Sequence, residues 1–194
     1  MKRSLLAFLA FTLCLGLSQA AYADGTPIAG LKRFKLDNGL ELFVLENHQV
    51  PLARIQITFR CGSITQTPET VGLFHLYEHM LFKGNSKYAT ETEFSAAMTQ
   101  LGVAEWNGGT STEYVTYYFT VPSGKTEAGL EFWSYAVREP LFEDDELEIE
   151  KSVVINEING FLSDPDQVYS AAMDKRLFSA YPWRRDIGGY EAVV

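Results

Sequence analysis

The feature that most constrains this chain is a trio of polar residues inside the apolar segment 72–85, which reads GLFHLYEHMLFKGN. His75 and His79 are four residues apart, so they project from one face of a helix and can bind a single metal ion. Glu78 lies near that face, where it can take a proton from water on the metal. Polar groups in such a helix are costly to bury unless a partner satisfies them. The alternative is a pair of core histidines hydrogen-bonded to the backbone, with Glu78 at the surface.

A second segment, residues 143–164, predicts a long helix with two carboxylates on its apolar face. A buried carboxylate needs a cation, a donor or a proton, and zinc on two histidines usually takes a third protein ligand. Glu157 is the candidate ligand, and Glu150 the candidate carboxylate that orients a ligand histidine. Alternatively, both glutamates lie at the rim of the helix and pair with lysines, but the adjacent Lys151 cannot share their face. The predicted stripe consists of Leu147, Glu150, Val154, Glu157 and Phe161.

Together the two segments resemble the inverted-motif zinc peptidases of the pitrilysin and insulinase type, which include the mitochondrial processing peptidases. The resemblance rests on H-x-x-E-H, on the glutamate 78 positions after His79, and on the surrounding EIEKSVVINEI. It extends from Leu31 to the C-terminus and implies one Zn²⁺ per chain. The implied roles are zinc ligands for His75, His79 and Glu157, general base for Glu78, and accessory acidic residue for Glu150.

Residues 107–123, NGGTSTEYVTYYFTVPS, resemble the strand segment along which this family lays its peptide substrate. The resemblance implies substrate contacts from Asn107 and Thr110, although the family more often has Asn-Ala where this chain has Asn107-Gly108. The functional interpretation of the aromatic alternation at positions 114–119 is that this strand lies at the edge of a cleft and pairs with an extended peptide. The alternative is purely structural, because aromatic residues such as those at positions 114–119 are good strand formers.

The resemblance implies a zinc-dependent metalloendopeptidase that hydrolyses peptide bonds of a polypeptide substrate with metal-activated water. One alternative is a non-catalytic peptide-binding or scaffold subunit of the same family that needs a partner chain. A second is a small-molecule lyase of the S-ribosylhomocysteine type, which has a similar histidine motif. That lyase uses a cysteine downstream of the motif as its third ligand, whereas Cys61 lies upstream of it.

The composition is that of an ordinary globular chain, with 46% hydrophobic and 21% charged residues over 194 positions. Its net charge of −9 argues against a nucleic-acid partner, since no basic stripe is available to neutralise phosphates. The same acidity would attract basic peptides over long range.

The first 23 residues predict a signal peptide. Lys2 and Arg3 precede an apolar run at residues 5–17, and residues 21–23 offer an A-x-A cleavage site. The run is short for a membrane span. Export to the bacterial periplasm is therefore expected, with an uncleaved membrane anchor or secretion as alternatives.

Residues 24–194 are expected to form one metallopeptidase domain of the α+β class, an antiparallel-rich sheet with helices on one face. Asn38-Gly39 predicts a hairpin turn, and Thr90 with Glu93 predicts a helix capping box. Since members of the resembling family have a larger first domain and a related second one, we expect a truncated C-terminus, or a short subunit that a partner completes. Predicted strands are 31–36, 40–46, 52–59 and 113–121, and predicted helices are 71–82, one beginning at Thr90, 125–138, 143–164 and 166–179.

Overall fold

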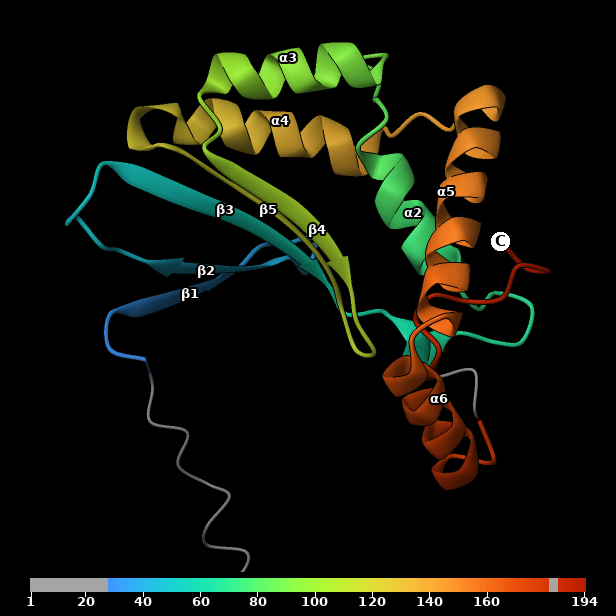
Figure 1. The fold of residues 1–194 in the computed structure, drawn as a ribbon. Helices are drawn as coiled ribbons and strands as arrows, with labels where there is room; N and C mark the ends of the chain where they lie inside the picture. The colour runs from blue at the N-terminus through green and yellow to red at the C-terminus, as the bar shows by residue number, and fades with distance from the viewer. Residues whose placement is uncertain (1–27, 182–184) are drawn as a thin grey trace, which may run out of the picture. The chain divides into compact units, whose positions relative to one another are not determined.

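The computed structural model describes residues 28–181 and 185–194 (Figure 1). The predicted signal peptide therefore lies outside the described residues. The chain divides into two compact units, one up to Val50 and one from Pro51 to Val194. Within the described ranges, no helix is both long and apolar enough to cross a membrane. The assignment of residues 24–194 to a single domain stays a prediction.

The described part of the first unit is an antiparallel hairpin of β1 (Leu31–Lys35) and β2 (Glu41–Leu45). Gly39 has a φ of 88°, which favours glycine at this turn. The Leu36 N–H donates to the Leu40 carbonyl at 2.8 Å and closes the loop. The hairpin predicted from Asn38-Gly39 is confirmed.

The second unit contains a three-stranded antiparallel sheet in the order β3-β5-β4. Its strands are β3 (Leu52–Phe59), β4 (Glu105–Thr110) and β5 (Val115–Pro122). Strict alternation along the central strand produces one buried face, because successive side chains of a strand point to opposite sides. The buried side chains of β5 are Val115, Tyr117, Phe119 and Val121.

Two helices, α3 (Glu91–Leu101) and α4 (Thr126–Arg138), lie along one face of this sheet (Figure 1). The Thr90 hydroxyl accepts the Glu93 N–H at 3.2 Å, so the predicted Thr90 cap is confirmed. The Glu93 carboxylate accepts the N–H of Ala89 at 2.8 Å, and not that of Thr90 as in a capping box. Helix α4 approaches the sheet closely at Gly129, where a Cβ would lie 2.8 Å from Ile55 Cδ1. The interior between the layers is aromatic and includes Phe94, Tyr117, Phe119, Phe132 and Trp133. The α+β class is confirmed.

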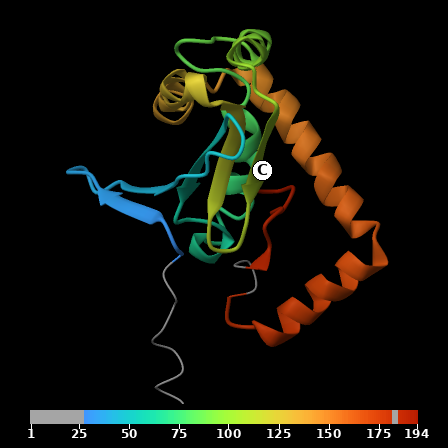
Figure 2. The same cartoon turned by 90° about the vertical axis from the view of Figure 1, so that its left-hand side faces the viewer.

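Beside the sheet, α2 (Leu73–Leu81) packs against α5 (Asp144–Leu162). Leu76 and Met80 of α2 meet Val154 of α5 and the C-terminal Val194 in a second apolar cluster. Figure 2 shows α5 leading into α6 (Pro165–Leu177). Short 3-10 turns at Ser63–Thr65 and Ser123–Lys125 complete the regular structure. The pairing of α2 with α5 brings the two predicted motif segments together.

Candidate metal centre

Helix α2 carries both motif histidines and begins at a glycine. Gly72 has a φ of 93°, and its N–H donates to the buried Gln66 side chain at 2.9 Å. From this start the helix places His75 and His79 one turn apart, with their rings in an edge contact at 4.9 Å between centroids. Their Nε2 atoms are 3.3 Å apart. The spacing in the sequence thus becomes a pair of convergent imidazoles.

Helix α5 adds a carboxylate to this pair. Glu157 Oε2 lies 3.3 Å from His75 Nε2 and 3.7 Å from His79 Nε2. The three residues offer ligand atoms that all lie within 4.8 Å of one another. Ligands about 2.0–2.1 Å from a tetrahedral zinc ion are separated from one another by about 3.3–3.4 Å. The observed separations therefore fit such an ion.

The hydrogen bonding and burial of the imidazoles also suit a cation. His79 Nδ1 lies 2.9 Å from Glu150 Oε2, and when Nδ1 donates to this carboxylate, Nε2 presents its lone pair. Burial and the neighbouring His79 lower the pKa of His75, although the charges of Glu78 and Glu157 act in the opposite direction. Neutral imidazole, the form that binds metals, is thereby favoured at His75.

The other ring nitrogen of His75 is buried. Its Nδ1 makes no hydrogen bond of normal geometry to a residue in the described ranges. The backbone of Gly188 is nevertheless close enough to raise the pKa of His75. Since solvent does not reach Nδ1, the imidazole meets solvent and ligands through its Nε2 side.

Glu150 is buried and bridges two cationic or donor groups on the α2 side. Its Oε2 contacts His79 Nδ1, and its Oε1 lies 2.7 Å from Lys83 Nζ. Burial alone would raise the pKa of Glu150, but the hydrogen bonds from Lys83 and His79 outweigh it and lower that pKa. The lysine pairing considered from the sequence is thus present, but through Lys83; Lys151 instead pairs with Glu148 at 3.3 Å.

The structure corrects the predicted apolar stripe on α5 at its C-terminal end. Glu150 and Val154 are buried, whereas the Glu157 side chain is 42% exposed and Phe161 is 50% exposed. Helix α2 is short and covers only part of α5, so the stripe continues past the contact. The candidate ligand Glu157 therefore stands at the solvent edge of the cluster.

Glu78 contacts strand β4. The Thr110 hydroxyl donates to Glu78 Oε2 at 2.6 Å and lies 3.4 Å from the Phe74 carbonyl. Gly108 supports this approach, since a Cβ there would lie 3.1 Å from Glu78 Cγ and 3.0 Å from the Phe82 ring. The predicted base is thus held by a hydroxyl from the sheet.

The aromatic strand predicted at the edge of a cleft is instead β5, the central strand of the three-stranded sheet, paired on both sides. The two residues predicted to contact substrate lie on the neighbouring β4, at the edge of that sheet. Asn107 is exposed, and its side-chain oxygen accepts the N–H of Gly108 at 2.9 Å. Thr110 is half-buried and engages Glu78. Thr110 therefore contacts the predicted base directly, whereas Asn107 lies further along the strand.

Sequence reasoning missed Lys83. A usable signal was its position four residues after His79, which continues the face that carries both histidines.

Comparison with known proteins identifies the family. A sequence profile described as Insulinase (Peptidase family M16) matches residues 42–189. The chain belongs to this insulinase family. It is similar to the uncharacterized zinc protease YmxG of Bacillus subtilis (strain 168), with 29% identity over 164 residues. The match covers 84% of this chain and 40% of YmxG, so the chain spans less than half of that relative.

Solved structures of insulinase-family proteins share the fold. The periplasmic protease PqqL from Escherichia coli superposes with a TM-score of 0.75 and 20% identity, over 86% of this chain and 19% of PqqL. A peptidase M16 inactive domain from Pseudomonas fluorescens gives a TM-score of 0.74 and 19% identity, over 82% of this chain and 38% of that one. The chain is thus metallopeptidase-like in family and fold.

Proposed function

We propose that this chain is the metal-binding part of a zinc-dependent metalloendopeptidase, and that His75, His79 and Glu157 are the zinc ligands. The observation that carries the proposal is the convergence of two imidazole nitrogens and one carboxylate oxygen from two helices, at 3.3–3.7 Å from one another. Zinc held there would act as a Lewis acid that acidifies water and polarises a peptide carbonyl. The exposed edge at Glu157 leaves access for water and substrate.

Glu78 is the proposed general base. Its Oε2 is fixed by the Thr110 hydroxyl, so Oε1 is the oxygen that accepts a proton from the attacking water. Glu78 then returns this proton to the nitrogen of the leaving amine. Glu150 is the proposed orienting carboxylate, because it holds His79 through Nδ1 and keeps Nε2 directed at the cluster.

Strand β4 is the proposed platform for the peptide substrate. It is the edge strand next to Glu78, and an extended peptide can add to such an edge through main-chain hydrogen bonds. Asn107 and Thr110 are the proposed contacts. This arrangement would present the scissile carbonyl beside the proposed base.

Two further features of the proposal concern the whole protein. We infer that a second, related domain or a partner subunit completes the substrate site, because the chain spans 40% of YmxG. We also propose export to the periplasm, which is supported by the basic, apolar and A-x-A pattern of residues 1–23 and by the likeness to PqqL, itself a periplasmic protease.

The test combines zinc analysis with cleavage of an internally quenched peptide library. Glu78→Gln should retain zinc and abolish cleavage, whereas Glu157→Gln should lose zinc affinity and cleavage together. Glu148→Gln is the matched control, since it removes an exposed carboxylate from the same helix. Full zinc affinity in Glu157→Gln would remove that residue from the ligand set.

A non-catalytic binding subunit is the second candidate, since the fold is shared with a domain described as inactive. It predicts a zinc-loaded chain that binds peptides of the library without cleaving them. Cleavage that disappears in Glu78→Gln would exclude it.

A further inference from the structure

A third functional side chain follows the two histidines along α2. His75, His79 and Lys83 are spaced by four residues, so they lie on one side of the helix and of the turn that ends it. Facing them on α5, Glu157 contacts His75, whereas Glu150 contacts both His79 and Lys83. Lys83 therefore belongs to the same row of contacts as the candidate ligands.

Glu150 divides its two oxygens between these partners. Oε1 lies 2.7 Å from Lys83 Nζ and Oε2 lies 2.9 Å from His79 Nδ1. The Glu150 side chain is only 6% exposed, so water has little access to replace either partner. With Oε1 held by the lysine, the rotation of the carboxylate is fixed and Oε2 is directed at the imidazole.

We propose that Lys83 is a positioning residue of the metal centre, which acts through Glu150 to orient His79. The inference rests on the proposed function. A stabilising role alone explains the pair poorly, because a buried ion pair often contributes no more stability than apolar residues of similar volume. Orientation of a ligand histidine is a role that apolar residues cannot supply.

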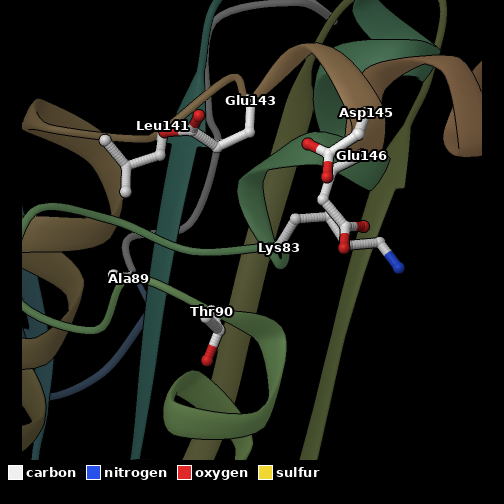
Figure 3. A pocket seen from close by; sticks show the side chains of 7 residues that line it. All are labelled: Lys83, Ala89, Thr90, Leu141, Glu143, Asp145 and Glu146. Atoms are coloured by element: carbon white, nitrogen blue, oxygen red, sulfur yellow. The ribbon is translucent and has the colours of Figure 1, made fainter.

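Lys83 makes a second contact, with Glu91, and it also lines a pocket. Its Nζ also lies 2.9 Å from Glu91 Oε2 on α3, whose side chain is 57% exposed. Beside it is a pocket of about 160 Å³, with Thr90, Glu143, Asp145 and Glu146 in its walls (Figure 3). The pocket has an acidic lining and room for a larger cation, so arginine at position 83 can be accommodated.

The experiment measures the zinc dissociation constant of the full chain by competition with a chromophoric chelator. Lys83→Met should weaken zinc binding about tenfold, the lower end of the effect of removing a group that supports a ligand. Lys83→Arg should restore most of the affinity. Lys151→Met is the matched control, because it removes a lysine of α5 that pairs with Glu148 and not with Glu150; its zinc affinity should be unchanged.

A double-mutant cycle tests whether Lys83 acts through Glu150. In a Glu150→Gln background, Lys83→Met should have no further effect on zinc affinity, since the two residues are one linked unit. Circular dichroism verifies folding, and Lys83→Gln replaces Lys83→Met if the latter fails to fold.

The outcomes separate the two proposals. Unchanged zinc affinity in both Lys83→Met and Lys83→Gln, beside a wild-type chain that binds zinc, would overturn the role of Lys83 alone. Equal losses from Lys83→Met with and without Glu150 would also overturn it. A wild-type chain without zinc affinity would instead overturn the metal site.

Discussion

At the scale of single residues, Tyr117 shows what the core tolerates next to the site. Its ring packs on Phe82 and Trp133, whereas its hydroxyl is buried and has no hydrogen-bond partner within residues 28–181 and 185–194. Burial, with the nearby charge of Glu78, raises the pKa of Tyr117, so the hydroxyl stays protonated. An unpaired buried hydroxyl costs about 1–3 kcal/mol. Tyr117→Phe should therefore leave the free energy of unfolding unchanged or raise it by about 1 kcal/mol, as measured by urea denaturation. Tyr117→Ala, which removes the ring, should cost about 3–5 kcal/mol; a similar loss in Tyr117→Phe would reveal a partner for the hydroxyl.

The buried carboxyl group of Asp186 should make the stability of the fold depend on pH. Burial raises its pKa, although the Gly189 N–H at 3.0 Å and the charge of Lys175 act in the opposite direction. A carboxylate whose folded-state pKa is raised stabilises the fold below its unfolded pKa of 3.8, and this contribution is lost as the pH rises through the folded-state pKa. Asp186→Asn should therefore be as stable as wild type or more stable at pH 7, and the difference should shift towards wild type as the pH falls through the raised folded-state pKa, with no further change below 3.8. Thermal unfolding across this range measures it, and a difference independent of pH would contradict the assignment.

At the scale of elements, sequence periodicity predicted the helices and strands that are specified by their local pattern of apolar and polar residues. The hairpin at Asn38-Gly39, strand β3 and helices α2, α4 and α5 were all predicted from local patterns. Strand β4 was not, because EWNGGT has two glycines and no alternation, and its pairing with β5 holds it in place. Likewise, helical spacing identified Glu150 and Glu157, but the contact of Glu150 with Lys83 joins α5 to the turn after α2, which is distant in sequence. The spacing of Lys83 places it on the face of the two histidines, but its partner on α5 depends on how the elements pack and cannot be read from periodicity.

Gly189, in the segment after α6, packs closely against the backbone at the start of α2. Gly189 has a φ of 89°, and a Cβ there would lie 2.4 Å from Gly72 Cα and 2.8 Å from the Val71 carbonyl oxygen. Gly189→Ala should thus lower the free energy of unfolding by more than about 1 kcal/mol. Since Gly72 begins α2, the variant should also weaken zinc binding. The matched control is Gly160→Ala in α5, where a Cβ meets nothing within 4 Å; it should stabilise by about 0.5–1 kcal/mol. Denaturant unfolding compares the two, and equal stability would show that the C-terminal segment does not pack on α2.

At the scale of the whole molecule, zinc bound by the candidate ligands would stabilise the unit that begins at Pro51. His75 and His79 lie on α2 and Glu157 lies on α5, so an ion bound by all three would cross-link two helices that also share a small apolar cluster and the contact of Glu150 with His79. A ligand that binds only the folded state stabilises it by about 2.7 kcal/mol at a free concentration of 100 times its Kd. Zinc should therefore raise the calorimetric unfolding temperature of the chain, and EDTA should reverse the shift. In Glu157→Gln the shift should shrink at the same zinc concentration, whereas in Glu148→Gln it should persist.

The remaining histidine, His48, is exposed and pairs only with Glu46 at 3.5 Å among its described contacts. If the shift were equal in wild type and Glu157→Gln but lost in His48→Ala, the zinc would be bound in the first unit, and the proposed centre between α2 and α5 would be wrong.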